Sequence, residues 1–191
     1  GYKTGLFTSP YITEFNERIR FCGENIGGGE LAAITEYVKP FADAMQDKPT
    51  EFELITAIGL EYFKRKGCDI VVLEVGVGGA LDATNIIPAP QVAVVTNIGL
   101  DHTDLLGNTL AEIATVKAGI VKEGCRAVFY PGDESVEAVY HTVCAEKNVT
   151  YTIADFSGIH LTHHDLEGQI FDYADHKDIQ LPLLGAHQLC N

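Results

Sequence analysis

Two apolar strands that each end in a polar turn constrain the fold of this chain most. The first runs through Ile70–Leu73 into Glu74 and a Gly76–Gly79 turn, and the second runs through Val92–Val95 towards His102. Continuous Val and Ile runs without polar alternation are typical of strands that are buried on both faces, as in a parallel sheet. We therefore expect an α/β fold with a mostly parallel sheet flanked by helices.

Glu74 and His102 stand near the carboxyl ends of these two strands. In open α/β sheets, ligands bind beyond that edge. A carboxylate and an imidazole there can share one divalent metal ion. The alternative is that Glu74 caps a turn and that His102 is a solvated loop residue, and the residues alone leave both interpretations open.

Composition narrows the class of protein. A chain of 191 residues can bury one sizeable core. The net charge of −14 argues against nucleic acid or a membrane surface as a partner, and no apolar run is long enough to span a bilayer. The five cysteines form no CxxC pair, which suits reduced thiols in a cytoplasmic protein. We expect a cytoplasmic monomer and, because the sequence starts on a strand-like segment without Met, a piece of a longer chain.

Apolar periodicity and turn residues place the other elements. Helical spacing predicts four helices, over 30–45, 50–66, 110–118 and 135–147, and the first follows a glycine loop at 27–29. In the second helix, the residues expected to face inward are Ile55, Ile58, Tyr62 and Phe63. Further strands are expected over 2–7, 126–130 and 149–153. This alternation is the pattern of a parallel α/β sheet.

The character of the sequence changes after Asp155. Short, roughly alternating segments at 159–163, 169–173 and 177–181 predict a small antiparallel β extension. We therefore divide the chain into a main α/β part over 1–154 and an extension over 155–191, which ends with the start of a next helix.

Several motifs have adequate structural explanations. The Gly76–Gly79 turn lacks the further glycine of a dinucleotide fingerprint, since Leu81 stands there, so its glycines more simply let the backbone turn beside a ligand. Ser9-Pro10 could begin a helix. Thr50 to Glu53 and Thr109 to Glu112 each have the form of a capping box.

Lys117 lies on the apolar face of its predicted helix, in step with Leu110, Ile113 and Ala114. A desolvated lysine has a lowered pKa, and its neutral amine can react with carbon dioxide to give a metal-ligating carbamate. The alternative, which spacing alone favours, is a lysine whose head reaches water.

Taken in order, these motifs resemble the folylpolyglutamate synthase / dihydrofolate synthase family of the Mur ligase superfamily. The matching segments are Gly5–Pro10, Phe15–Arg20, Thr50–Glu53, Leu73–Gly79, Leu81–Asn85, Gly99–Thr103, Lys117–Ile120 and Gly185–Asn191.

The resemblance implies a Mur-ligase central ATPase-like domain and an ATP-dependent ligase. Such an enzyme phosphorylates the carboxyl of a folate or of dihydropteroate with ATP, and L-glutamate then attacks the acyl phosphate. The resemblance gives Ser9, Glu74 and His102 as Mg²⁺ ligands. It gives Lys117 as a catalytic residue that is carbamylated and helps to hold a second Mg²⁺.

The resemblance also implies the binding residues for the other substrates. Asn191 would contact the nucleotide. The residues that would contact the pterin are Thr50, Glu51, Phe52, Glu53, Leu81, Asp82 and Ala83.

The chain departs from the family pattern at three points. The phosphate-cradling Gly-x-x-x-x-Gly-Lys-Ser/Thr loop should precede Gly1 by a helix and does not occur in this sequence. The C-terminal domain expected after Asn191 also lies outside it. Ala80 follows Gly79 where the family has Arg, which removes a basic side chain beside the substrate turn and bears on substrate preference. We therefore expect the fragment to be inactive alone.

Two rival interpretations remain. A cell-wall Mur ligase domain would share the sheet, the glutamate and the carbamylated lysine, although Leu6–Pro10 together with Thr50–Glu53 favours the folate branch. The other rival is a non-catalytic binding module that has lost its phosphate loop.

Overall fold

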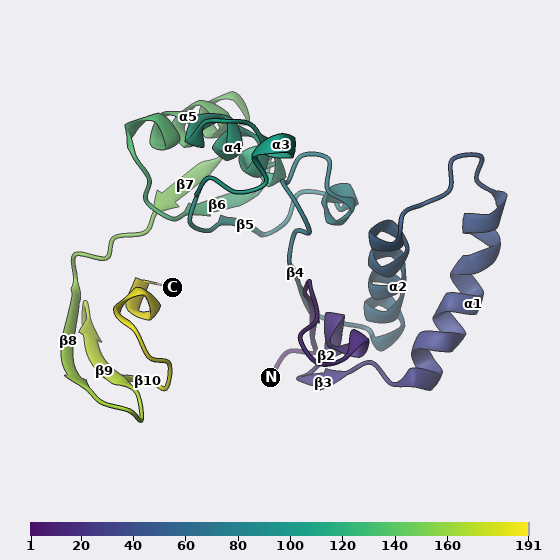
Figure 1. Cartoon of the computed structure of the whole chain (residues 1–191), viewed down its shortest axis with the longest axis horizontal. Coiled ribbons are helices and arrows are strands. Elements are labelled where there is room, and N and C mark those ends of the chain that lie inside the picture. Colours follow the sequence, from purple (N-terminus) through teal and green to yellow (C-terminus); the bar gives the residue numbers. More distant parts are fainter. Residues whose placement is uncertain (191) are drawn as a thin grey trace.

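The computed structural model describes residues 1–190, which form three small sheets with helices packed around them (Figure 1). The first sheet has the strand order β3-β2-β1-β4, and β1 pairs parallel with β4 and antiparallel with β2. Its strands are β1 (Thr4–Phe7), β2 (Ile19–Phe21), β3 (Glu24–Asn25) and β4 (Ile70–Leu73). The hairpin of β2 and β3 is an addition that the sequence patterns did not indicate.

Two long helices accompany this first sheet, α1 (Gly28–Ala44) and α2 (Glu51–Lys66). The predicted inward residues of α2 are all buried, and they pack with Phe7 of β1 and Ile19 of β2 in one core. The helix begins at the predicted capping box of Thr50 and ends at Gly67, whose φ of 60° lies in the left-handed region that glycine adopts without strain.

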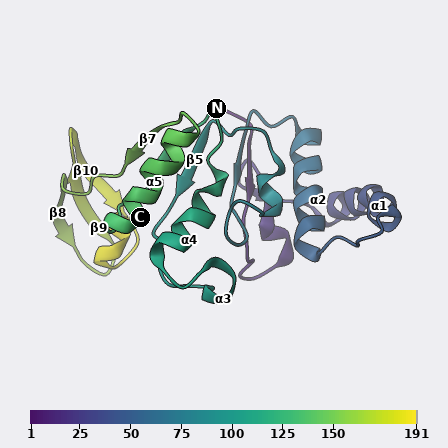
Figure 2. The same cartoon turned by 90° about the horizontal axis from the view of Figure 1, so that it is seen from above.

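The second sheet is fully parallel, with the order β5-β6-β7. Its strands are β5 (Val92–Val95), β6 (Arg126–Phe129) and β7 (Thr150–Ile153). Helices α4 (Leu110–Lys117) and α5 (Glu134–Glu146) cover the same face of it (Figures 1 and 2). Phe129 stacks on Tyr140 of α5 with ring centroids 4.0 Å apart, at the centre of a second core.

The third sheet is the predicted antiparallel extension, with the order β10-β9-β8. It lies at one end of the molecule, opposite to α1 (Figure 2). Its strands are β8 (Ile159–His164), β9 (Gln169–Tyr173) and β10 (His176–Leu181). The remaining elements are α3 (Thr103–Leu106) and the short 3-10 helices η1 (Phe15–Arg18), η2 (Ala83–Ile86), η3 (Ala118–Ile120) and η4 (Ala186–Cys190).

The α/β class, the parallel pairing and the antiparallel extension are confirmed, but the parallel strands lie in two sheets. The prediction that both apolar strands are buried on both faces is wrong for this chain. Val72 of β4 is 52% exposed and Val94 of β5 is 55% exposed. The reason is that β4 and β5 each pair with a single neighbour, and helices cover only one face of the second sheet.

Helix α1 also differs from the prediction. It begins at Gly28, so two of the glycines expected in a loop lie in its first turn, where amide groups have no intrahelical partner in any case. No helix in the part of the chain that the structure describes is both long and apolar enough to cross a membrane.

Candidate functional site

The carboxyl ends of β1 and β4 bring Ser9 and Glu74 together. Because these strands are parallel neighbours, the residues that follow them emerge at the same edge. Glu74 Oε2 accepts the backbone N–H of Ser9 at 2.7 Å, and the Glu74 N–H donates to the carbonyl of Phe7 at 2.9 Å. Glu74 thus does hold a turn, as the structural alternative proposed, and it stands beside another predicted ligand. No helix begins at Pro10, so the capping explanation of Ser9 is wrong.

His102 lies in the loop after β5, immediately before α3. Its φ of 49° places it in the left-handed region, which is uncommon for a residue with a side chain. The imidazole is 54% exposed, and its Nε2 is 3.8 Å from Oδ2 of Asp101. A Cβ atom added to Gly78 would lie 3.2 Å from Leu106 of α3, so the turn after β4 and the segment after His102 are neighbours.

The predicted Mg²⁺ ligands are Ser9, Glu74 and His102. Within residues 1–190 there is no group of three or more His, Cys, Asp and Glu side chains placed to hold a metal ion. The set of Ser9, Glu74 and His102 contains only two such residues, and the third donor is a hydroxyl. A shared ion at these residues therefore stays a prediction.

Lys117 ends α4 and is half-buried. None of the residues that the structure describes forms a hydrogen bond or ion pair with its amine. Its backbone carbonyl faces the glycine turn so closely that a Cβ on Gly79 would lie 2.7 Å from it. The structure therefore sets the backbone of Lys117 beside the turn that follows β4, and leaves its amine unpaired among the described residues.

An apolar cavity of about 570 Å³ opens between α1, α2 and residues 80–86. Phe41 of α1 and Met45, which follows that helix, line it together with Leu54 of α2, Leu81 and Ile86. Phe41 and Met45 recur at the helical spacing that predicts the helix over 30–45, yet they are 62% and 52% exposed. Their exposed surfaces border this cavity.

The predicted pterin residues divide into two groups. Four of them line the cavity: Glu53, Leu81, Asp82 and Ala83. Thr50, Glu51 and Phe52 are not among its lining residues. Phe52 packs edge-on to Phe7 with centroids 6.0 Å apart, and a Cβ on Gly76 would lie 2.5 Å from its ring, so Phe52 belongs to the packed interior.

The two carboxylates that line the cavity, Glu53 and Asp82, differ in how many hydrogen bonds they accept. Asp82 accepts four hydrogen bonds, from the amides of Gly76 and Val77 at 3.0 Å each and from the amide and hydroxyl of Thr84. These bonds fill its acceptor capacity. Asp82 therefore shapes the turn that follows β4 and has little capacity left for a ligand.

Glu53 retains one free oxygen. Its Oε2 accepts the backbone N–H and the hydroxyl of Thr50 at 2.7 and 2.8 Å, which completes the predicted capping box. These bonds lower the pKa of Glu53 below its usual value of 4.5. Among the described residues, nothing bonds to its Oε1. Glu53 thus presents a charged acceptor at the cavity.

Sequence reasoning missed the residues that hold the cavity wall in place. Asn85 donates from Nδ2 to the carbonyls of Ala80 and Gly119, at 3.1 and 3.4 Å. Lys122 donates to carbonyls of the same segment. No local pattern predicts the contacts of Asn85 with Gly119 and of Lys122 with Asn85, since they join positions 34 and 37 residues apart. Asn191, the predicted nucleotide contact, lies outside the described residues.

Comparison with known proteins agrees with this geometry. The Mur ligase middle domain family matches residues 28–191. The chain is 37% identical over 203 residues to the dihydrofolate synthase/folylpolyglutamate synthase of Bacillus subtilis, which covers 100% of this chain and 46% of that protein. It is 37% identical over 208 residues to folylpolyglutamate synthase of Lacticaseibacillus casei, with coverage of 100% and 47%.

Solved structures give the same relationship. The apo form of L. casei FPGS superposes with a TM-score of 0.91 at 36% identity, covering 99% of this chain and 48% of that one. A complex of FPGS with AMPPCP and folate superposes with a TM-score of 0.88 at 34% identity, again over 99% and 48%. The chain spans about half the length of the relatives it matches. It therefore belongs to the Mur ligase family as a middle domain, and the relatives that match it are folylpolyglutamate and dihydrofolate synthases.

Proposed function

We propose that this chain is the central part of an ATP-dependent ligase that adds L-glutamate to a folate, with dihydropteroate as a second acceptor. The observation that carries the proposal is the apolar cavity, whose lining includes Glu53, a residue with one carboxylate oxygen unbonded among the described residues. Relatives of this chain are named folylpolyglutamate synthases, and one is described in complex with AMPPCP and folate.

The pterin ring fits the chemistry of the cavity. It is flat and largely apolar on its faces, and its edge carries amino and N–H donors. Leu54 and Leu81 would contact the faces, and Glu53 Oε1 would accept from the edge. A charged acceptor makes a stronger hydrogen bond than a neutral one, so Glu53 is the residue that would fix the orientation of the ring.

Ser9, Glu74 and His102 would hold Mg²⁺ at the neighbouring edge of the first sheet. Glu74 Oε1 and the Ser9 hydroxyl have no other partner in the described part of the chain. Oxygen donors with one imidazole suit Mg²⁺ and Mn²⁺. When bound, the ion would neutralise charge on the phosphates of ATP during transfer.

Lys117 would supply a second anionic ligand. Its amine is unpaired and half-buried, so it can react with carbon dioxide without first breaking an ion pair. Carbamylation converts a cation into an anion beside the Gly76–Gly79 turn. In the proposed reaction, ATP phosphorylates the acceptor carboxylate and releases ADP, and the glutamate amine then displaces phosphate to form the amide.

Turnover by the longer protein that contains this chain tests the proposal. We expect ADP release that needs both a folate acceptor and L-glutamate, and a product heavier by one glutamyl residue. A muropeptide acceptor from cell-wall synthesis should support no ADP release. ADP release with the muropeptide alone would favour the cell-wall ligase instead.

The sequence upstream of Gly1 distinguishes a ligase from the remaining alternative, a non-catalytic binding module. A Gly-Lys-Ser or Gly-Lys-Thr loop within roughly forty residues before Gly1 would supply the backbone amides and lysine that bind phosphates. If the reading frame holds no such loop, the chain is a binding module and not part of a ligase.

A further inference from the structure

Lys122 makes a contact that the proposed reaction does not use. Its Nζ donates to the backbone carbonyls of Asn85 at 2.6 Å and Ile87 at 2.5 Å. No carboxylate forms an ion pair with it within residues 1–190. The chain has 27 acidic residues, yet this ammonium bonds two backbone carbonyls of a distant segment. We therefore interpret Lys122 as a residue that stabilises the segment carrying those carbonyls.

That segment is the end of η2, which forms one wall of the cavity. The last carbonyls of a helix have no partner within the helix, and an ammonium there satisfies them with charge-assisted bonds. The large apolar side chains of the wall add little burial, since Leu81 is 100% exposed and Ile86 is 79% exposed, and the one buried residue of η2 is the polar Thr84. Polar contacts must therefore fix its position.

We propose that Lys122 is a positioning residue that clamps residues 85–87 against the region after η3 and so sets the shape of the cavity. Asn85 supports the same arrangement through its bond to Gly119 in η3. This inference rests on the proposed function, because the ligand whose affinity it affects is the pterin.

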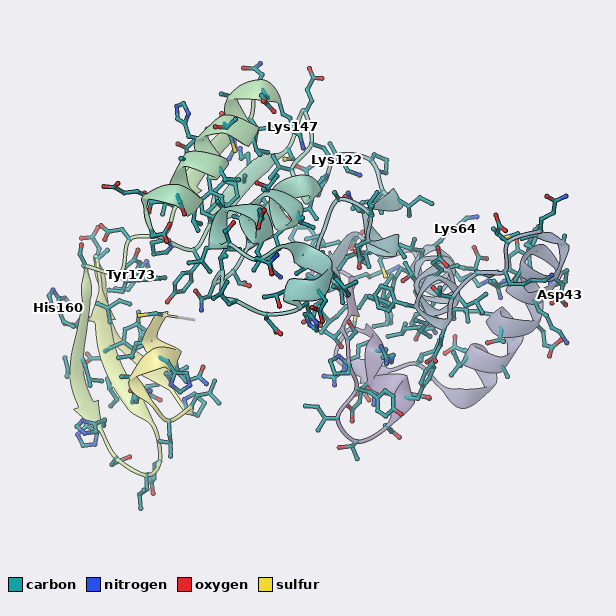
Figure 3. The ribbon with its side chains drawn as sticks, turned by 45° about the horizontal axis from the view of Figure 1, so that its top comes forward. Asp43, Lys64, Lys122, Lys147, His160 and Tyr173 are labelled. Carbon is teal, nitrogen blue, oxygen red and sulfur yellow. The ribbon has the colours of Figure 1, made fainter. Side chains whose placement is uncertain are left out.

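Lys147 provides a matched control. Its Nζ also donates to a backbone carbonyl, that of Val121, at 2.5 Å. It follows α5 and has no bond to residues 80–87. Figure 3 labels both lysines. Replacing either one removes an ammonium and its backbone contact, but of the two lysines only Lys122 bonds to the cavity wall.

Hydrogen exchange and pteroate titration of the chain test the clamp together. In Lys122→Met, the Asn85 amide, which bonds to the carbonyl of Asp82 at 2.9 Å, should exchange at least tenfold faster. Pteroate should bind at least tenfold more weakly. Lys147→Met should leave both quantities within twofold of the wild type, and Lys122→Arg should restore most of the protection because it keeps the donors and the charge.

Unchanged exchange of the Asn85 amide in Lys122→Met would overturn the clamp. Faster exchange with unchanged pteroate affinity would overturn its role in setting the cavity shape. If the wild-type chain does not bind pteroate at all, the proposed function of the cavity fails, and the exchange rates still decide whether Lys122 fixes the wall.

Discussion

Replacing Gly79 by Ala should destabilise the fold through close contacts with the backbone of α4. The added Cβ would lie 2.7 Å from the carbonyl oxygen of Lys117 and 2.8 Å from that of Val116. Both atoms belong to the backbone at the end of α4, so they cannot rotate away as a side-chain tip would. Gly79 is not among the residues with positive φ, so the contact, and not the backbone conformation, makes glycine necessary here.

The size of the effect follows from two losses. Relieving such overpacking costs about 1–3 kcal/mol. Moving the turn away from α4 also weakens the bond from the Ala80 N–H to the Val116 carbonyl, now 3.2 Å, and such a bond contributes about 0.5–1.5 kcal/mol. The free energy of unfolding should therefore fall by about 1.5–4.5 kcal/mol. At this chain length the midpoint temperature should fall by about 5–15 °C.

Urea unfolding followed by circular dichroism measures this change, with Gly99→Ala as the control. Gly99 lies in the loop after β5, and a Cβ there meets no atom within 4 Å. Its replacement should change the free energy of unfolding by less than about 0.5 kcal/mol. If Gly79→Ala and Gly99→Ala unfold at the same urea concentration, the close approach of the turn to α4 is refuted.

Four further results are expected. The Tyr140 hydroxyl is buried without a partner among the described residues, and burial raises its pKa to about 12. Tyr140→Phe keeps the stacking on Phe129, so it should raise the free energy of unfolding in urea by about 1 kcal/mol. A lower stability of the variant would reveal a partner of the hydroxyl. The Asn108 amide and the Thr109 cap hold the pKa of Glu112 below its usual value of 4.5. The stability that the ionised Glu112 contributes is therefore present above about pH 4.5 and is lost as the pH falls further. The difference in urea midpoint between the wild type and Glu112→Gln should shrink from about pH 7 to about pH 3, and a constant difference would contradict this. In the longer protein, Lys117→Arg should abolish turnover and the ¹³C carbamate signal obtained with labelled bicarbonate, whereas full activity would return Lys117 to a solvated lysine. The chain alone should bind Mg·ATP only weakly in calorimetry, because it holds no Gly-x-x-x-x-Gly-Lys-Ser/Thr loop, and a dissociation constant below about 10 μM would reveal another phosphate site.

The features that could be predicted from the sequence are those determined by nearby residues. Helix α2 is an example, because its apolar period, its Thr50 cap and Gly67 all act within one helix. The parallel strands follow from continuous apolar runs, and the antiparallel extension follows from alternating segments between polar turns.

What could not be predicted depends on residues that are distant in the sequence. The Val runs of β4 and β5 indicate apolar faces but not whether another element covers them, and here one face stays open. The spacing of Phe41 and Met45 likewise shows a helix face without showing that a cavity lies opposite. The clamp by Lys122 joins positions 35 and 37 residues apart, so no window along the chain contains it.

Calorimetric titration of the chain with pteroate tests the central claim most directly, in the wild type and two matched variants. Glu53 and Glu112 each complete a capping box with a threonine, and Gln can replace Glu in that motif. Only Glu53 lines the cavity.

We expect the wild type and Glu112→Gln to bind pteroate with equal affinity. Glu53→Gln should bind at least tenfold more weakly, because its amide replaces the charged oxygen that accepts from the pterin edge and a tenfold loss corresponds to about 1.4 kcal/mol. The absence of binding by the wild type, or equal affinities for the two variants, would contradict the assignment of this cavity to the pterin.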